Sequence, residues 1–218
     1  MLELLLPQRC VVCGAGGVQL CAGCRNGLPL IRPPLCERCG APTRWPVARC
    51  RECAGRRLAF ARARAAVVYD DRVRAFVSSW KERGLRGLAH AAADVVIAHV
   101  PRPDVGALTF VPSDGDRSTR RGHHPAHRLA HELGERWDVR VDALLGRTRA
   151  VARQRGLPLA QRRRNVRGAF AARSAVPALV VLVDDVYTTG ATAAAAASAL
   201  RAGGARRVEV VCFARAVR

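Results

Sequence analysis

Residues 178–192 read Ala-Leu-Val-Val-Leu-Val-Asp-Asp-Val-Tyr-Thr-Thr-Gly-Ala-Thr. The uninterrupted apolar run from Ala178 to Val183 is typical of a parallel strand that is buried on both faces. An alanine-rich run from Thr192 to Ala202 follows, and Gly203-Gly204 after it indicates a helix with a glycine C-cap. A buried strand, a short loop and a helix predict the α/β class for this part of the chain.

Two carboxylates follow this predicted strand directly. Asp184 and Asp185 stand where open parallel sheets place their ligands. The next loop, Thr188–Thr192, is small and hydroxylated and opens a helix, so backbone N–H groups there can surround a phosphate. Carboxylates beside a phosphate suit ribose hydroxyls or Mg²⁺. The alternative interpretation is a solvated aspartate pair. The stretch has neither the Gly-Lys-Ser/Thr of a P-loop nor G-x-G-x-x-G.

Strand and helix patterns alternate on both sides of this stretch. We expect strands at 65–69, 108–111, 139–145 and 208–213, and helices at 72–80, 89–100 and 125–135. This alternation predicts one α/β domain over residues 61–218 with a mostly parallel sheet. Residues 54–64 are interpreted as a basic linker. The arginine-rich 147–167 segment is interpreted as a loop with one short helix, either a lid or a surface that faces nucleic acid.

Eight of the nine cysteines fall in four Cys-x-x-Cys pairs near the N-terminus. They are Cys10, Cys13, Cys21, Cys24, Cys36, Cys39, Cys50 and Cys53. Two such pairs hold one zinc ion in a tetrahedron, so four pairs predict two structural zinc sites. Sequential and crossed pairing of the pairs are both open. Disulfides and redox activity fit less well, since cytosolic thiols stay reduced and a redox motif needs one reactive pair. We therefore expect residues 1–60 to form a small double zinc-ribbon domain.

The amino-acid composition indicates which classes of partner the protein can bind. The chain has 218 residues, with 37 Lys and Arg against 17 Asp and Glu, a formal charge of +20. A GC-rich genome explains part of this arginine excess, but the charge still favours anionic partners. Half the residues are apolar, which excludes a wholly disordered chain. No apolar run approaches the length of about 20 residues that a membrane span needs. With no recognisable signal peptide, we expect the cytoplasm. Cys212 is expected to be a buried strand cysteine.

The 180–192 stretch resembles the 5-phosphoribosyl-1-pyrophosphate (PRPP) motif of type I phosphoribosyltransferases. The resemblance implies a sheet with helices on both faces, and it implies that Asp184 and Asp185 bind the ribose hydroxyls and carry catalysis. It also implies a 5′-phosphate site at Thr188, Thr189, Gly190, Ala191 and Thr192. The whole chain resembles the ComF family, whose members join an N-terminal zinc region to such a domain.

Further motifs carry the ComF resemblance. They are Trp80-Lys81 with Gly84, Val111-Pro112 with Arg117 and Arg121-Gly122, Gln154 with Arg162 or Arg163, Asn165-Val166 and Gly168-Ala169-Phe170. By the resemblance, Lys81 and Arg121 are candidates to bind pyrophosphate oxygens, with ordinary surface cations as the alternative. His123, His127 and His131 are spaced to share a helix face. A metal site there is one interpretation, and solvated histidines are the simpler one.

Two functions follow. The first is a phosphoribosyltransferase that binds PRPP with Mg²⁺ and transfers phosphoribose to a nitrogen nucleophile. The chain leaves no residues for a glutaminase domain, so we expect ammonia or another nitrogen compound. The second is a non-catalytic factor of DNA uptake in natural competence. Its zinc ribbons and basic surface would bind single-stranded DNA, another nucleic acid or a competence protein such as a helicase, with the PRPP pocket as a sensor.

Overall fold

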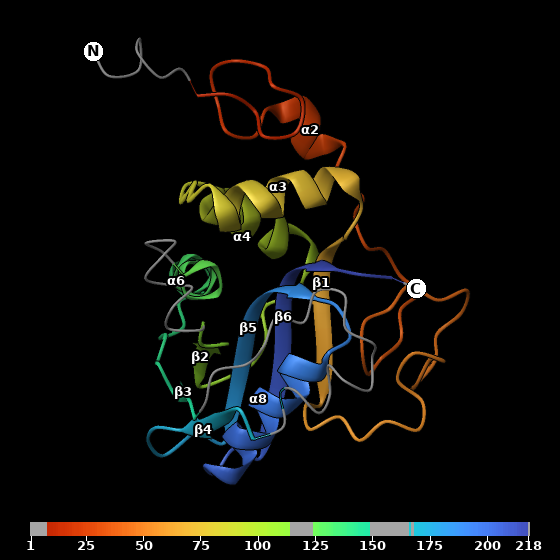
Figure 1. The fold of residues 1–218 in the computed structure, drawn as a ribbon. Coiled ribbons are helices and arrows are strands. Elements are labelled where there is room, and N and C mark those ends of the chain that lie inside the picture. Colours follow the sequence, from red (N-terminus) through yellow and green to blue (C-terminus); the bar gives the residue numbers. More distant parts are fainter. Residues whose placement is uncertain (1–7, 114–123, 149–165, 167, 218) are drawn as a thin grey trace.

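The computed structural model describes residues 8–113, 124–148, 166 and 168–217. Its centre is a four-stranded parallel sheet in the order β1-β6-β5-β2 (Figure 1). The strands are β1 (Arg62–Val68), β2 (Ala107–Phe110), β5 (Leu179–Tyr187) and β6 (Arg207–Arg215). A separate antiparallel pair consists of β3 (Leu145–Arg147) and β4 (Phe170–Ala172). The predicted α/β class with a mostly parallel sheet is confirmed.

Three helices cover one face of the sheet (Figure 1). They are α3 (Asp71–Glu82), α4 (Leu88–His99) and α6 (Pro125–Trp137). In α3, residues 73, 76, 77 and 80 are apolar and buried, which is the spacing of one helix face. The Asp70 side chain accepts a hydrogen bond of 2.9 Å from the Val73 N–H and starts this helix. Local sequence thus fixes where α3 begins and which side it buries.

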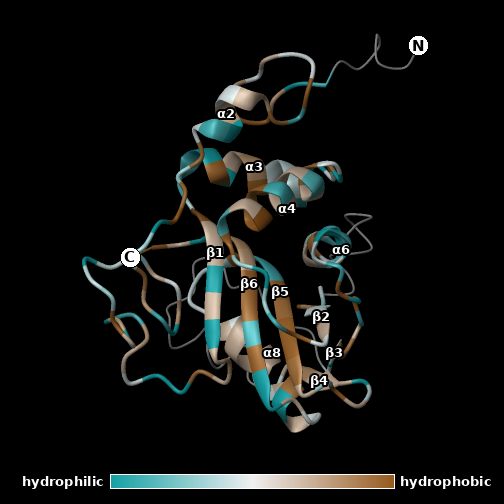
Figure 2. Cartoon of the chain, turned by 180° about the vertical axis from the view of Figure 1, so that it is seen from behind, coloured by the Kyte–Doolittle hydropathy of each residue, from teal (hydrophilic) through white to brown (hydrophobic). Residues whose placement is uncertain are grey.

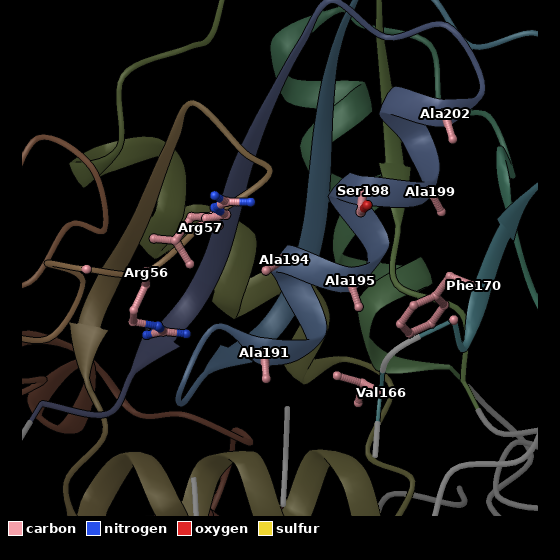
Figure 3. A pocket seen from close by; sticks show the side chains of 13 residues that line it. Arg56, Arg57, Val166, Phe170, Ala191, Ala194, Ala195, Ser198, Ala199 and Ala202 are labelled. Carbon is pink, nitrogen blue, oxygen red and sulfur yellow. The ribbon is translucent and has the colours of Figure 1, made fainter. Parts of the chain in front are cut away.

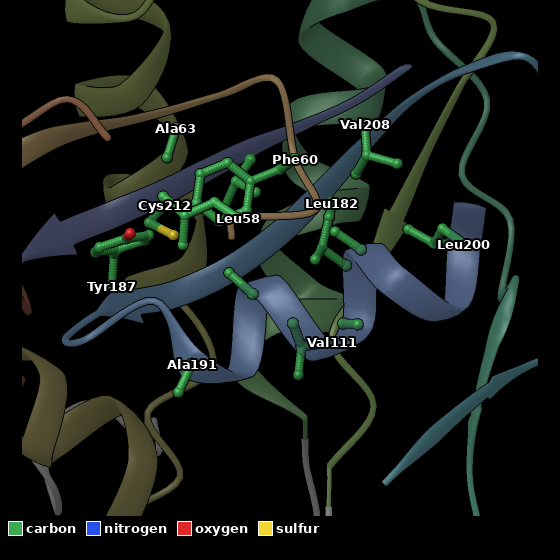
Figure 4. Close-up of a cluster of buried hydrophobic side chains, with 14 of the residues drawn as sticks. Leu58, Phe60, Ala63, Val111, Leu182, Tyr187, Ala191, Leu200, Val208 and Cys212 are labelled. Carbon is green, nitrogen blue, oxygen red and sulfur yellow. The ribbon is translucent and has the colours of Figure 1, made fainter. Parts of the chain in front are cut away.

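Helix α8 (Ala191–Ala202) covers the opposite face of the sheet. Its buried side is made almost wholly of alanine, so the helix approaches the strands closely. Figure 2 shows the middle parts of the central strands β5 and β6 as strongly hydrophobic. The core between α8 and the sheet, drawn in Figure 4, includes Leu182, Leu200 and Cys212. Cys212 is fully buried in β6, as predicted.

Two predicted segments differ from the structure. Leu58 and Phe60 are buried in the α8 core, so the linker interpretation of 54–64 is wrong for these residues. The predicted strand at 139–145 is also wrong over 139–144, where Val141 makes only one isolated bridge, to Leu108. Val141 instead packs beside Gly134, where a Cβ would overlap it. Its apolar character therefore reflects packing on α6 rather than a strand.

The N-terminal cysteine-rich segment contacts the sheet and both neighbouring helices. The Ile31 N–H donates to the Ala66 carbonyl of β1 at 2.8 Å. Near the short helix α2 (Ala22–Asn26), Arg72 of α3 donates to the Gly27 carbonyl at 2.8 Å. Arg25 lies 3.5 Å from Asp94 of α4. No helix in the described part of the chain is long and apolar enough to cross a membrane.

Candidate functional site

The eight N-terminal cysteines form two clusters. Cys10, Cys13, Cys21 and Cys24 make the first cluster, and Cys36, Cys39, Cys50 and Cys53 make the second. Within each cluster the four sulfur atoms lie within 4.8 Å of one another. The pairing is therefore sequential, and the crossed alternative is wrong. All nine cysteines lie in the described part of the chain, and none forms a disulfide.

The sulfur spacing fits zinc. Four thiolates at about 2.3 Å from one zinc ion lie about 3.8 Å apart. The Cys13–Cys21 sulfurs are 3.7 Å apart, and the Cys36–Cys53 sulfurs are 3.6 Å apart. Each cluster supplies four thiols, which fills a tetrahedral site and leaves no open position for catalysis. The clusters are structural zinc sites.

Backbone N–H groups point at the sulfurs, as thiolates require. The Cys50 N–H lies 3.3 Å from the Cys36 sulfur, and the Cys21 N–H lies 3.5 Å from the Cys10 sulfur. Burial raises the pKa of both thiols, but the backbone N–H groups outweigh it and lower the pKa of Cys10 to about 6 and that of Cys36 to about 7. Both leading cysteines are thus prepared to bind metal as thiolates.

The carboxylate pair lies within β5 rather than beyond it. This strand continues to Tyr187, and Asp184 pairs in register with Cys212 of β6. Asp185 is 7% exposed, and one of its carboxylate oxygens lies 2.8 Å from the Lys81 Nζ. Lys81 comes from the last turn of α3. The structure therefore brings together Lys81 and the two aspartates, and Lys81 is not an ordinary surface cation.

The two carboxyls of Asp184 and Asp185 repel each other when both are charged. Burial and the neighbouring Asp185 charge raise the pKa of Asp184 to about 7, against the opposing effect of Lys81. Burial lowers the pKa of Lys81, but Asp185 outweighs it and the net direction is upward. One cation thus faces two carboxyls, and one carboxyl holds its proton near neutral pH. Such a site favours a further cation or hydroxyl donors.

The Thr188–Thr192 loop starts α8 beside the carboxylates. Gly190 has φ of 69°, a left-handed backbone that favours glycine. A Cβ at Gly190 would also overlap the Tyr187 hydroxyl. The Ala191 N–H lies 3.3 Å from the Thr189 hydroxyl oxygen. The loop is therefore a tight turn whose backbone approaches the sheet edge, as a phosphate site needs.

Gly190→Ala is expected to lower the free energy of unfolding by roughly 3 kcal/mol, since left-handed strain of 1–2 kcal/mol adds to the overlap with Tyr187. Gly55→Ala is a matched control, because Gly55 has φ of 67° but nothing within 4 Å of its Cβ position. Gly55→Ala should lose only the part of the free energy of unfolding that comes from backbone strain. Urea denaturation of both variants measures the difference. Equal losses would contradict the described packing of Tyr187.

Sequence reasoning missed a histidine at this edge. His124 begins α6, and its Nδ1 lies 3.1 Å from the His127 backbone nitrogen. Its Nε2 lies 2.6 Å from the Ser113 backbone nitrogen, just after β2. Burial and the neighbouring His127 lower the pKa of His124 to about 4, against the opposing charge of Asp185. A neutral histidine thus stands near the carboxylates. Its position just before Pro125 was the available signal, since proline favours the first helical turn.

Comparison with known proteins identifies the family. The chain is 31% identical over 210 residues to the DNA utilization protein YhgH of Salmonella typhi, with 90% of each chain covered. The chain belongs to the ComF family. Competence protein F of Haemophilus influenzae is 28% identical over 90% of each chain. The YhgH protein of Escherichia coli K12 is 28% identical over 97% of this chain and 99% of that protein. Residues 1–54 match the double zinc ribbon domain family.

Part of the ComF motif set lies outside the described residues. The motif residues in this group are Arg117, Arg121, Gly122, Gln154, Arg162, Arg163 and Asn165. The metal candidate His123 and most of the 147–167 segment also lie outside the described residues. The pyrophosphate role expected of Arg121 stays a prediction. In the described residues, no histidine joins a three-ligand metal cluster. The rings of His127 and His131 lie 4.5 Å apart on α6, and His131 is exposed.

A groove of about 520 Å³ runs along the outer side of α8 (Figure 3). Its floor is alanine, and Arg56, Arg57 and Phe170 stand at its sides. The groove meets the Thr188–Thr192 loop only at Ala191 and includes neither aspartate. In this ComF chain, Asp184, Asp185 and Lys81 therefore lie at the sheet edge and outside the groove, whose charged lining residues are Arg56 and Arg57.

Proposed function

We propose that this ComF chain binds PRPP with Mg²⁺ at the carboxyl edge of β5, and that it acts in DNA uptake. The observation that carries the proposal is the arrangement of Asp184, Asp185 and Lys81 beside the tight Thr188–Thr192 loop. The loop offers backbone N–H groups to the 5′-phosphate, and the aspartates accept from ribose hydroxyls. The names of the relatives, DNA utilization protein and competence protein F, support the biological context.

The same residues suit transfer of the phosphoribosyl group. The bond between ribose C1 and the pyrophosphate oxygen breaks, and a C1–nitrogen bond forms. Asp184 and Asp185 orient the ribose, and Lys81 lies 2.8 Å from Asp185, where it also adds positive charge toward a bound phosphate. Mg²⁺, when bound with PRPP, neutralises charge on the leaving pyrophosphate. The nucleophile loses its proton to solvent or to the departing pyrophosphate.

Charge favours a second candidate, a nucleic-acid-binding factor. The formal charge of +20 is carried almost wholly by arginine, and a basic surface binds phosphates without reading sequence. In this alternative the zinc ribbons and exposed arginines bind single-stranded DNA or a competence protein, and PRPP acts as a signal. Affinity for DNA that falls steeply with salt, without pyrophosphate release, would favour this candidate over the transferase.

Calorimetry with Mg-PRPP tests the proposal. The zinc-loaded wild type is compared with Asp184→Asn/Asp185→Asn at one fixed salt concentration, because ion pairing depends on salt. Asp142→Asn is the matched control, since Asp142 pairs with Arg140 near the amino end of β2. We expect binding in the wild type and the control and none in the double variant. A folded wild type that binds no Mg-PRPP would overturn the proposal. Pyrophosphate release with ammonia then separates enzyme from sensor.

The raised pKa of Asp184 predicts a pH dependence of folding. The folded state holds this proton up to about pH 7, whereas the unfolded chain releases it near the ordinary value of 3.8. The free energy of unfolding therefore falls as the pH rises between these values. Asp184→Asn should remove this component and be roughly 2 kcal/mol more stable than the wild type at pH 8. Urea denaturation from pH 5 to pH 8 measures it. Parallel pH profiles for the two proteins would contradict the assignment.

A further inference from the structure

Arg215, the last residue of β6, joins the sheet to the second cysteine cluster. Its side chain is almost completely buried, and its Nη1 donates to the Cys39 carbonyl at 2.6 Å. Its Nη2 donates to a Glu52 carboxylate oxygen at 2.6 Å and lies 3.5 Å from the Cys39 sulfur. A buried guanidinium needs such partners, because an unpaired one is costly. The carboxyl end of β6 is thus held by the ribbon.

The contact continues from Arg215 to the Thr188–Thr192 loop. The Arg215 guanidinium carbon lies 4.6 Å from the centre of the Tyr187 ring. The Phe60 ring packs against the same tyrosine in a T-shaped arrangement, with 6.2 Å between the ring centroids. Tyr187 in turn fills the space where Gly190 lacks a side chain. The position of this ring, and with it the turn at Gly190, therefore depends on the ribbon.

A second route runs through Arg56, three residues after Cys53. Its Nη1 donates to the Glu52 carbonyl at 3.3 Å, and its Nη2 donates to the Thr189 carbonyl at 2.6 Å. A trans peptide is planar, so its C=O and N–H point in opposite directions. Holding the Thr189 carbonyl toward Arg56 therefore turns the Gly190 N–H away from the ribbon. That N–H is one of the donors that a phosphate on the loop requires.

The first cysteine cluster makes different contacts. Its described polar links to the remainder of the chain run from Arg72 to Gly27 and from Arg25 to Asp94, both on the α3–α4 side. Within the described residues, no hydrogen bond or ion pair joins this cluster to the Thr188–Thr192 loop. The two ribbons are therefore attached to different parts of the molecule, and only the second reaches the candidate phosphate site.

We propose that the second ribbon positions the Thr188–Thr192 loop through Arg56 and Arg215, so that zinc at Cys36, Cys39, Cys50 and Cys53 sets the geometry of the phosphate site. Both arginines are positioning residues, because they hold the loop backbone or Tyr187 and not the ligand. The inference rests on the proposed function for its ligand. Its structural content, that the ribbon orders the loop, is measurable without any ligand.

The test is hydrogen exchange in peptides that cover residues 186–194 of the zinc-loaded full chain. In Arg56→Gln we expect about tenfold faster exchange there than in the wild type, since a charge-assisted hydrogen bond of this kind is lost. Affinity for Mg-PRPP should fall about tenfold by the same loss. Zinc content should remain at two ions per chain, one for each cluster. Arg215→Met should also speed up hydrogen exchange in the same peptides.

Arg64→Gln is the matched control. Arg64 donates to the Glu37 carbonyl of the same ribbon at 3.0 Å and to the Ala63 carbonyl at 2.8 Å, and neither hydrogen bond reaches the loop. It should leave exchange in residues 186–194 unchanged. Unchanged exchange in Arg56→Gln, or an equal increase in Arg64→Gln, would overturn the inference. A wild type that binds no Mg-PRPP would instead contradict the proposed function, and the exchange comparison would still decide the positioning role.

Discussion

Cys53→Ser is expected to lower the melting temperature by roughly 10 °C or more, because a structural zinc site contributes folding free energy directly. Cys36 and Cys53 are fully buried and belong to the same core as α8. Loss of the second zinc therefore removes the ribbon and also the partners of buried Arg215. Differential scanning calorimetry with zinc analysis measures both effects.

Cys13→Ser is the comparison that makes this prediction specific. Cys13 is exposed, and its cluster contacts only the α3–α4 side among the described residues. We expect it to lose one zinc with a smaller fall in melting temperature. Cys212→Ala, in the core but outside both clusters, should keep both zinc ions. An equal fall in Cys13→Ser and Cys53→Ser would contradict the different attachment of the two ribbons.

Lys81→Met is expected to destabilise the protein by roughly 2 kcal/mol at pH 8, because it leaves two mostly buried carboxyls without their cation. The ion pair is largely shielded, since the Lys81 side chain is 28% exposed and that of Asp185 is 11% exposed. At pH 5 the loss should shrink, because Asp184, whose pKa is about 7, is then largely protonated and carries no charge that needs a cation. The pKa of Asp184 should rise further in this variant. Urea denaturation at both pH values measures the difference.

Lys81→Arg is the control that keeps the positive charge but changes the shape of the cationic group. It should recover most of the stability, but less of the affinity for Mg-PRPP, since a guanidinium presents its donors differently from an ammonium. A stability loss in Lys81→Met that is the same at pH 5 and pH 8 would contradict the electrostatic role. It would indicate that the lysine acts through its aliphatic packing alone.

The features that sequence predicted well are local. Cys-x-x-Cys spacing is a complete signal for a zinc knuckle, and the run from Ala178 to Ala202 contains its own strand, loop and helix. Strand register and the grouping of the cysteine pairs could not be predicted from the sequence, because they depend on contacts between distant segments. The cysteine pairing is one example. The continuation of β5 through Asp184 and Asp185 is another, since it depends on β6 lying alongside.

The arginines show why part of the site was missed. Arg56 contacts Thr189 and Arg215 contacts Cys39 across more than a hundred residues of sequence. No pattern in the sequence distinguishes Arg56 and Arg215 from the many other arginines of the chain. His124 had a local signal, its place before Pro125, but its closeness to Asp185 comes from the packing of α6 beside β5. Long-range polar contacts of this kind become visible only in the folded chain.

The most direct test of the central claim is a crystal structure of the zinc-loaded protein with Mg-PRPP. We predict the 5′-phosphate on the backbone N–H groups of the Thr188–Thr192 loop, and the ribose hydroxyls on Asp184 or Asp185. PRPP bound instead in the groove along α8, or against the zinc ribbons with the loop empty, would contradict the claim.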